Sequence, residues 1–316
     1  LGFTTLVESR TESDGRVVSD INHPLALGGL TDGVTNLELT AAYATLANRG
    51  IYTEPIFYTK ILDANGKVLL ENEPKKEQVV KESTAWLLTN AMEDVVTKGT
   101  GKLLKLQEID MPVTGKTGST SDYNDLWFSG YTPYYTATIW AGFDNNRSQT
   151  ERNFNRIIWR TIMERVHIAK GLEKKTFTMP NSIVTAKVCT KSGKLAVEGL
   201  CDHYIGGDSV QVEYFAKGTE PTEKCNVHVK ATICKESSAL ATEYCPKNKK
   251  KENVYLDKVE TGVTDDTPYV LPKDTCTVHS GISYEDTNPS APINNNSIDD
   301  NSDGELSNFN TFWQFP

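Results

Sequence analysis

The sequence has no apolar run near the roughly 18 residues that a membrane span requires, so it predicts no transmembrane helix. The first 188 residues contain no cysteine, which excludes disulfides and thiolate metal sites from that region. Acidic residues outnumber basic ones, 42 to 33, which gives a formal net charge of −9. Residues 280–316 have no Lys or Arg and hold six of the acids: Glu285, Asp286, Asp299, Asp300, Asp303 and Glu305. The remainder is nearly balanced, which argues against nucleic acid as a partner.

The ends of the chain carry little folding information. The sequence begins at Leu1 rather than Met and has no signal-like segment, so we expect its start to be a cut edge of a longer protein. Residues 281–316 are rich in Asn, Ser, Asp and Pro, cannot bury a core and are predicted to be disordered. A length of 316 residues suggests about two domains.

The first 172 residues predict helices before an antiparallel sheet. Thr35 and Glu38 form a capping box that opens a helix, and Gly50 suits its left-handed end. The segments 56–62 and 67–71 flank a turn-rich linker and predict a hairpin. A second helix is predicted at 84–97, ending near Gly99.

Three short β-type segments follow, at 113–117, 126–131 and 134–143. Their tight connections predict an antiparallel sheet. A closing helix at 153–170 should lie across one face of that sheet. We expect its buried side to consist of the most apolar residues: Phe154, Ile157, Ile158, Ile162 and Val166.

The most informative motif is Lys116-Thr117-Gly118-Ser119-Thr120, at the end of the first predicted strand. A lone Lys-Thr-Gly is weak, since any surface lysine before a turn matches it. The flanking sequence therefore decides how the motif is interpreted.

That flanking sequence resembles class A penicillin-binding proteins. The matches are residues 27–50, 115–128 and 140–144, in order and at suitable spacing, and they extend over roughly residues 20–170. The resemblance implies an α/β (α+β) fold, the antiparallel sheet flanked by helices of the penicillin-binding and β-lactamase-like enzymes. It also implies that the chain is the C-terminal part of a transpeptidase domain with a Cys-rich extension.

The resemblance implies a role for each residue of the motif. Lys116 would supply positive potential, and Thr117 with Ser119 or Thr120 would offer hydroxyls to the substrate carboxylate. Gly118 would let the substrate backbone approach, and the Ser119 amide would be one oxyanion donor. The implied ligands are D-Ala-D-Ala stem peptides of peptidoglycan and β-lactams, and no cofactor is implied.

The nucleophile that this chemistry needs is missing. Neither Ser-x-x-Lys nor Ser-x-Asn occurs in the 316 residues, so no catalytic residue is predicted and the isolated chain should not acylate. We expect the nucleophile in an N-terminal half of the same protein, together with a glycosyltransferase and an anchor at the outer face of the cytoplasmic membrane. Alternatives are a D,D-carboxypeptidase or β-lactamase, and a non-catalytic wall-binding or scaffold protein.

The second informative feature is a repeat that contains every cysteine. Residues 189–201 align with 234–245, and the halves end in Cys225-Asn-Val-His228 and Cys276-Thr-Val-His279. An even count in polar surroundings favours disulfides in an oxidising compartment. Among 15 possible connectivities, the repeat suggests Cys189–Cys201, Cys234–Cys245 and Cys225–Cys276.

A rival interpretation is a metal site. Cys225, His228, Cys276 and His279 together make a chemically valid zinc set, whereas the histidines may equally be ordinary surface residues. The sequence therefore predicts three parts: a transpeptidase portion at 1–172, a duplicated Cys-rich module at 173–280 and an acidic tail at 281–316.

Overall fold

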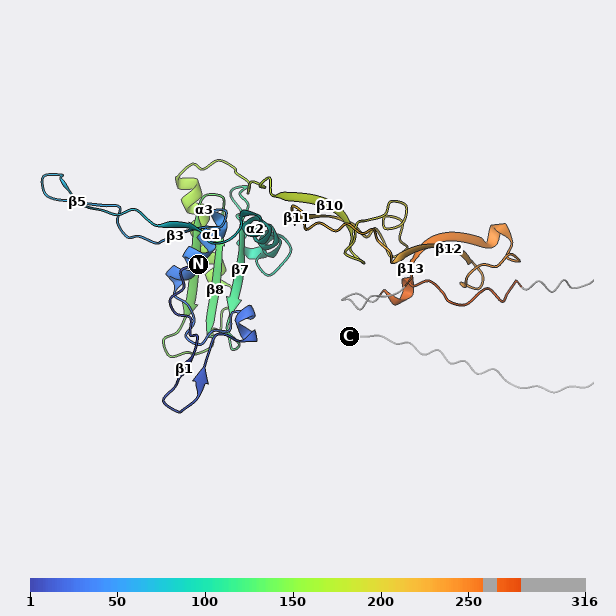
Figure 1. Ribbon diagram of the computed structural model, residues 1–316, viewed down its shortest axis with the longest axis horizontal. Coiled ribbons are helices and arrows are strands. Elements are labelled where there is room, and N and C mark those ends of the chain that lie inside the picture. The colour runs from blue at the N-terminus through green and yellow to red at the C-terminus, as the bar shows by residue number, and fades with distance from the viewer. Residues whose placement is uncertain (258–265, 280–316) are drawn as a thin grey trace, which may run out of the picture. The chain divides into compact units, whose positions relative to one another are not determined.

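The computed structural model describes residues 1–257 and 266–279, which are the coloured parts of Figure 1. The tail predicted at 281–316 lies outside the described residues. The chain forms two compact units. Of the described residues, one unit comprises 1–231, 253–257 and 266–271, and the other comprises 232–252 and 272–279. No helix within the described ranges is both long and apolar enough to span a membrane.

The elements follow one another as the sequence patterns suggest. The helices are α1 (Asn36–Ala47), α2 (Glu82–Thr97) and α3 (Phe154–Ala169), with 3-10 turns at His23–Leu27, Lys102–Leu104, Lys247–Lys249 and Thr267–Tyr269. The strands are β1 (Arg10–Thr11), β2 (Val17–Val18), β3 (Ile51–Thr53), β4 (Lys60–Leu62), β5 (Val68–Glu71), β6 (Lys76–Gln78), β7 (Thr114–Ser119), β8 (Asp125–Tyr131), β9 (Thr136–Gly142), β10 (Ile183–Cys189), β11 (Val210–Ala216), β12 (His228–Cys234) and β13 (Lys250–Leu256).

The predicted antiparallel sheet is confirmed. It has the order β7-β8-β9, so β7 is an edge strand. The register pairs Lys116 with Ser129, and Gly115 with Gly130. A glycine is required at 115, because a Cβ there would lie 2.4 Å from the Ser129 carbonyl oxygen. The backbone of β7 and β8 is therefore packed without room for a side chain at this point.

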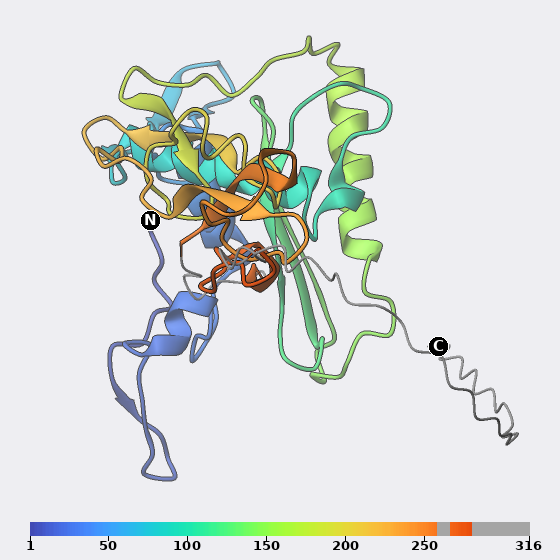
Figure 2. The same ribbon diagram turned by 90° about the vertical axis from the view of Figure 1, so that its right-hand side faces the viewer.

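Helices cover both faces of this sheet (Figure 2). On one face, the rings of Phe128 and Trp159 meet edge to face with centroids 4.8 Å apart, which anchors α3. On the other face, the Tyr131 hydroxyl lies 2.6 Å from the Thr89 hydroxyl of α2. The prediction that the closing helix lies across one sheet face is confirmed, because burying a sheet requires such a cover.

The capping box at the start of α1 is confirmed as well. The Glu38 amide donates to the Thr35 hydroxyl at 3.2 Å, and the Thr35 amide donates to the Glu38 carboxylate at 3.1 Å. Glu38 also accepts from the amide and hydroxyl of Thr4, at 2.8 and 2.6 Å. Gly50 has φ +87° and follows the helix as the sequence predicts.

The predicted buried side of α3 is wrong. Ile157, Ile158 and Ile162 are exposed, and the buried residues are Asn155, Trp159, Met163, Glu164 and His167. Residues four apart share a face of a helix, so the Trp-Met-His stripe faces the sheet and the isoleucines face outward. Two of the buried polar residues have hydrogen-bond partners: Glu164 accepts from the Glu108 amide at 2.9 Å, and His167 has a partner at each ring nitrogen.

His167 is almost fully buried beneath the sheet. Its Nε2 lies 2.8 Å from the Thr132 hydroxyl and its Nδ1 lies 2.7 Å from the Met163 carbonyl. Both ring nitrogens therefore have partners, and burial of this imidazole carries no unpaired polar atom. A histidine that is satisfied in this way is a structural residue.

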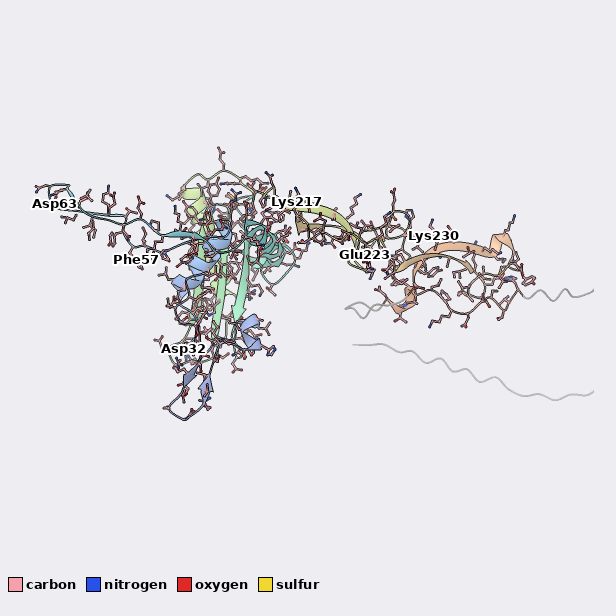
Figure 3. All side chains as sticks on the ribbon, in the orientation of Figure 1. Asp32, Phe57, Asp63, Lys217, Glu223 and Lys230 are labelled. Carbon is pink, nitrogen blue, oxygen red and sulfur yellow. The ribbon has the colours of Figure 1, made fainter. Side chains whose placement is uncertain are left out.

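The predicted hairpin is confirmed as β4 and β5, which pair from Lys60 with Glu71 to Leu62 with Val68. Figure 3 shows Asp63 at its tip, extended away from the β7–β9 sheet. Phe57, at its base, is 89% exposed. The Cys-rich part contains two further ribbons, β10 with β11 and β12 with β13.

Candidate functional site

A cavity of about 930 Å³ opens over the face of the β7–β9 sheet that α1 covers. Its lining comes from residues 25–34, from α1 and from all three strands of the sheet. All five residues of the Lys-Thr-Gly-Ser-Thr motif contribute to it: Lys116, Thr117, Gly118, Ser119 and Thr120. The sheet floor includes Trp127, whereas Phe128 is fully buried in the core.

The side chains of the motif leave β7 on both faces of the strand. Because side chains alternate across a strand, Lys116 and Gly118 lie on the α1 side, and Thr117, on the opposite face, still contributes to the cavity lining. Lys116 is exposed, and its Nζ donates to the Thr117 carbonyl at 2.9 Å. Gly118 stands opposite Trp127, and a Cβ at 118 would lie 3.2 Å from the Trp127 Cβ. The cavity wall therefore presents an ammonium group beside a stretch of bare backbone.

The charged groups of the cavity leave this ammonium without a counter-ion. Asp32 binds Arg10, and the Arg10 guanidinium holds the pKa of that carboxyl below its ordinary value. Asp125 is held by neutral donors of the sheet. Within the described part of the chain, Lys116 has no ion-pair partner. An anion that enters the cavity would meet this cation first.

Asp125 orders the turn between β7 and β8. Its carboxylate accepts from Trp140 Nε1 at 2.9 Å and from the Thr120 hydroxyl at 3.3 Å. The Asp125 amide in turn donates to the Thr120 hydroxyl at 2.9 Å. These contacts hold Thr120, which lines the cavity, and they give the Asp125 carboxylate a structural role in the turn.

Thr100 contacts a residue of the site, and sequence reasoning missed it. Its hydroxyl lies 3.1 Å from the Thr117 hydroxyl, although 17 positions separate the two residues. It follows α2 in the glycine-flanked segment Gly99-Thr-Gly101. The Arg156 side chain of α3 donates to the Thr100 carbonyl at 2.9 Å. The only signal in the sequence was the pair of glycines around it.

The cysteines form a second candidate site, and here the structure corrects the sequence. All six are free thiols, so the predicted bridges Cys189–Cys201, Cys234–Cys245 and Cys225–Cys276 are absent. The thiols gather instead by repeat, each time with one histidine: Cys189, Cys201, Cys225 and His228 in the first, and Cys234, Cys245, Cys276 and His279 in the second. Three thiols around one imidazole cannot pair off completely.

The rival zinc set is corrected too. It combined Cys225 and His228 with Cys276 and His279, but the structure divides these four residues between the two groups. The physical reason is that each repeat folds around its own side chains. The two Cys-x-x-His motifs were recognised in the sequence. In the structure, each motif groups with the two cysteines that precede it in the same repeat.

Comparison with known proteins agrees with this fold. Residues 1–164 match the penicillin-binding protein transpeptidase domain, and residues 179–230 match the C-terminal domain of penicillin-binding protein 1A. Penicillin-binding protein 1A of Clostridium novyi is 32% identical over 78% of this chain, and that of Clostridium botulinum strain Langeland is 37% identical over 73%. The chain belongs to the penicillin-binding protein transpeptidase family.

A solved structure shares this fold over part of the chain. The crystal structure of penicillin-binding protein 1A from Haemophilus influenzae has a TM-score of 0.54 and 25% identity over 65% of this chain. The alignment covers 35% of that crystallised chain. The sequence likewise spans 29% of the Clostridium novyi relative and 28% of the Clostridium botulinum one. These residues therefore correspond to a minor part of each relative.

Proposed function

We propose that this chain forms the Lys-Thr-Gly wall of a serine D,D-transpeptidase site and that a segment outside these 316 residues supplies the nucleophile. The observation that carries the proposal is the cavity over β7, where the unpaired Lys116 ammonium stands beside three hydroxyl side chains. The family match supports the reaction class. The substrate would be a stem peptide ending in D-Ala-D-Ala.

The terminal carboxylate of such a peptide needs a cation and hydrogen-bond donors. Lys116 would supply the charge, and Thr117 and Thr120 would supply hydroxyl donors. No other described strand pairs with the outer edge of β7, so an extended peptide can bind there as an additional strand. Gly118 leaves this edge open, because it presents no side chain to the incoming backbone.

The chemistry is acyl transfer in two steps. A serine oxygen attacks the penultimate D-Ala carbonyl, an ester forms, and the terminal D-Ala leaves as an amine. A second stem-peptide amine then attacks the ester, forms the cross-linking amide and frees the serine. The Ser119 amide would bind the oxyanion formed in each step. A β-lactam would follow the first step and remain as a slowly hydrolysed ester.

A fluorescent penicillin distinguishes this proposal from its rivals. The 316-residue chain alone should stay dark on a denaturing gel, whereas the longer protein that includes a Ser-x-x-Lys segment should be labelled. Lys116→Ala in that longer protein should slow labelling roughly 30-fold, as expected for a lost charge-assisted hydrogen bond worth about 2 kcal/mol. Lys187→Ala, an exposed lysine on β10, is the matched control and should label normally.

Two outcomes would overturn the proposal. Covalent labelling of the 316-residue chain would show that it has a nucleophile of its own. Equal labelling of the Lys116→Ala and Lys187→Ala proteins would show that the Lys-Thr-Gly strand does not bind the carboxylate.

A further inference from the structure

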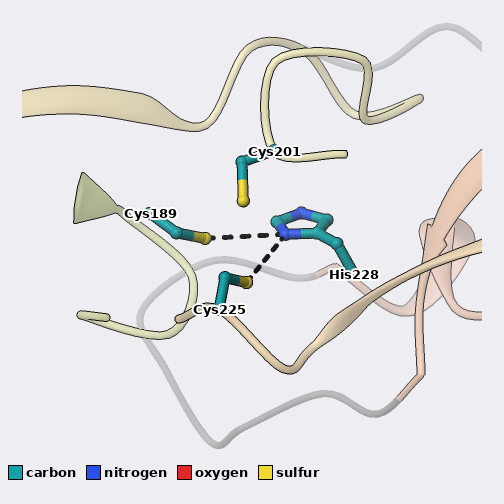
Figure 4. Close-up of side chains that lie close together, drawn as sticks. All are labelled: Cys189, Cys201, Cys225 and His228. Atoms are coloured by element: carbon teal, nitrogen blue, oxygen red, sulfur yellow. Dashed lines mark hydrogen bonds between the residues drawn. The ribbon is translucent and has the colours of Figure 1, made fainter. Parts of the chain in front are cut away.

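Each Cys-rich repeat directs four side chains toward one point. In both groups the three sulfurs and the imidazole nitrogen all lie within 4.8 Å of one another. Figure 4 shows Cys189, Cys201 and Cys225 gathered at one side of the His228 ring. All four of these residues are buried, and in the second group only His279 is partly exposed. The two sites thus form closed pockets of soft ligands.

The same ring nitrogen faces the sulfurs in both groups. His228 Nδ1 lies 3.5 Å from the Cys189 sulfur and 3.4 Å from the Cys225 sulfur. His279 Nδ1 lies 3.4 Å from the sulfurs of both Cys234 and Cys276. In a tetrahedron with metal–sulfur bonds of about 2.3 Å and metal–nitrogen bonds of about 2.0 Å, neighbouring ligand atoms are about 3.5 Å apart. The nitrogen–sulfur distances in both groups therefore fit the ligands of a tetrahedrally coordinated ion.

The outer nitrogen of each histidine also has an oxygen partner. His228 Nε2 lies 3.4 Å from the Ser209 hydroxyl, which itself donates to the Cys201 carbonyl at 2.7 Å. His279 Nε2 lies 3.0 Å from the Glu236 carboxylate. A proton on Nε2 satisfies this oxygen and leaves the Nδ1 lone pair directed at the sulfurs, as in metal-binding histidines.

Backbone amides support a negative charge on the remaining sulfurs. The Val197 amide donates to the Cys201 sulfur at 3.3 Å, and the Thr242 amide donates to the Cys245 sulfur at 3.3 Å. The two repeats place these amides equivalently, four and three residues before the cysteine. A metal-bound thiolate accepts such bonds better than a neutral thiol does.

We propose that each repeat binds one Zn²⁺ ion through three cysteine thiolates and a histidine Nδ1. A Cys₃His set is a common structural zinc site, and sulfur with imidazole favours zinc over the hard cations that select oxygen. All four positions are filled by protein side chains, so the sites leave no place for a substrate and are structural. This proposal does not depend on the transpeptidase proposal.

In the second repeat, the ion would take the place of an apolar core. Within the described part of the second unit, the buried apolar cluster is Cys234, Cys245 and Cys276, packed against Ala241. A core made of the ligands themselves buries too little apolar surface to fold such a small unit. The free energy of metal binding would then be the free energy of folding.

Metal analysis of the 316-residue chain tests the proposal. After zinc loading and desalting, elemental mass spectrometry should find one zinc ion per repeat, hence two per chain. Cys225→Ser and Cys245→Ser should each retain about one, and the double variant none. His203→Ala, which alters an exposed histidine beside Asp202, should retain both and is the control. Co²⁺ loading of the unaltered chain should give the thiolate charge-transfer bands of a tetrahedral site.

Three results would overturn the proposal. They are the absence of bound zinc, zinc content that is unchanged in the Cys225→Ser and Cys245→Ser chains, and disulfide-linked peptides such as Cys189–Cys201 in a non-reduced digest. The unaltered chain alone decides the first and third, so misfolding of a variant cannot obscure the answer.

Glu236 is a positioning residue in this scheme, and its substitution gives a second test. Glu236→Gln should lower the zinc affinity of the second site by 10-fold or more, as expected for loss of an outer-shell carboxylate. Competition with a chelating dye measures this, and the first site should release its zinc as before. Equal affinity in Glu236→Gln and the unaltered chain would contradict the proposed histidine geometry.

Discussion

The hydroxyl oxygens of Thr100 and Thr117 lie 3.1 Å apart, which joins the segment after α2 to the Lys-Thr-Gly strand. Thr117 is therefore oriented by a residue that precedes its own strand. The Arg156 bond to the Thr100 carbonyl extends this link to α3. The position of the hydroxyl thus depends on the packing of both helices against the sheet.

Thr100→Val should slow acylation by a fluorescent penicillin about five-fold in the protein that carries the Ser-x-x-Lys segment. The reason is the loss of one hydrogen bond worth about 1 kcal/mol, which leaves the Thr117 hydroxyl free to rotate. Thr100→Ser keeps the hydroxyl and should label at the original rate. If the Ser and Val proteins label equally slowly, the hydroxyl pair is not the cause.

The two glycines of β7 should respond differently to alanine. Gly115→Ala places a Cβ 2.4 Å from the Ser129 carbonyl and should destabilise the 316-residue chain by roughly 1–3 kcal/mol in urea unfolding. Gly118→Ala meets only the Trp127 Cβ at 3.2 Å and should cost less. Its larger effect should be slower penicillin labelling, because the methyl group projects into the cavity. Equal losses of stability would refute this distinction.

Ionisation of Glu38 should make the stability of the first unit depend on pH. Hydrogen bonds from the Thr4 side chain, the Thr4 amide and the Thr35 amide lower its pKa from 4.5 to about 2. A carboxyl whose pKa is lower in the folded state stabilises the fold fully above pH 4.5, and this stabilisation disappears as the pH falls toward 2. The melting temperature of the unaltered chain should therefore be higher than that of the Glu38→Gln chain at pH 7. The two melting temperatures should be equal near pH 2.

Thermal scans of both proteins across that range measure the effect. Glu8→Gln alters a carboxylate outside the capping box and is the control. A constant difference between the Glu38→Gln and unaltered chains at all pH values would show that the ionised carboxylate is not what matters.

The inward face of α3 can be tested by a pair of substitutions. Trp159→Ala removes a fully buried ring and its Nε1 bond to the Ala137 carbonyl at 2.9 Å. We expect a loss of roughly 3–5 kcal/mol in the free energy of unfolding. Ile158→Ala, at a position that is 42% exposed, should change it by less than about 0.5 kcal/mol. A larger loss of unfolding free energy in Ile158→Ala than in Trp159→Ala would support the buried face that the sequence predicted.

Local signals explain why most elements could be predicted. The capping residues of α1 and the alternation in β8 specify their structures without distant partners, so those predictions hold. The face of α3 could not be predicted in the same way. His167 is less apolar than Ile158, and its burial depends on hydrogen bonds to Thr132 and Met163 that only the folded chain provides.

Distance along the chain limits the prediction of sites in the same manner. The motif at Lys116 could be recognised because its residues are consecutive. The cavity around it also includes residues between 25 and 43, which lie far away in the sequence. The cysteine partners were misjudged for a related reason. Symmetry between the halves suggested pairing Cys225 with Cys276, but the physical neighbour of Cys225 is His228 of its own repeat.

Each Cys₃His group takes all of its side chains from a single repeat. The ligand sets are therefore separate, although the core around the first group also uses Leu256 and Tyr269, which lie between Cys245 and Cys276 in the sequence. An ion bound by one group would not cross-link the two repeats, and its loss would leave the other set of four ligands complete.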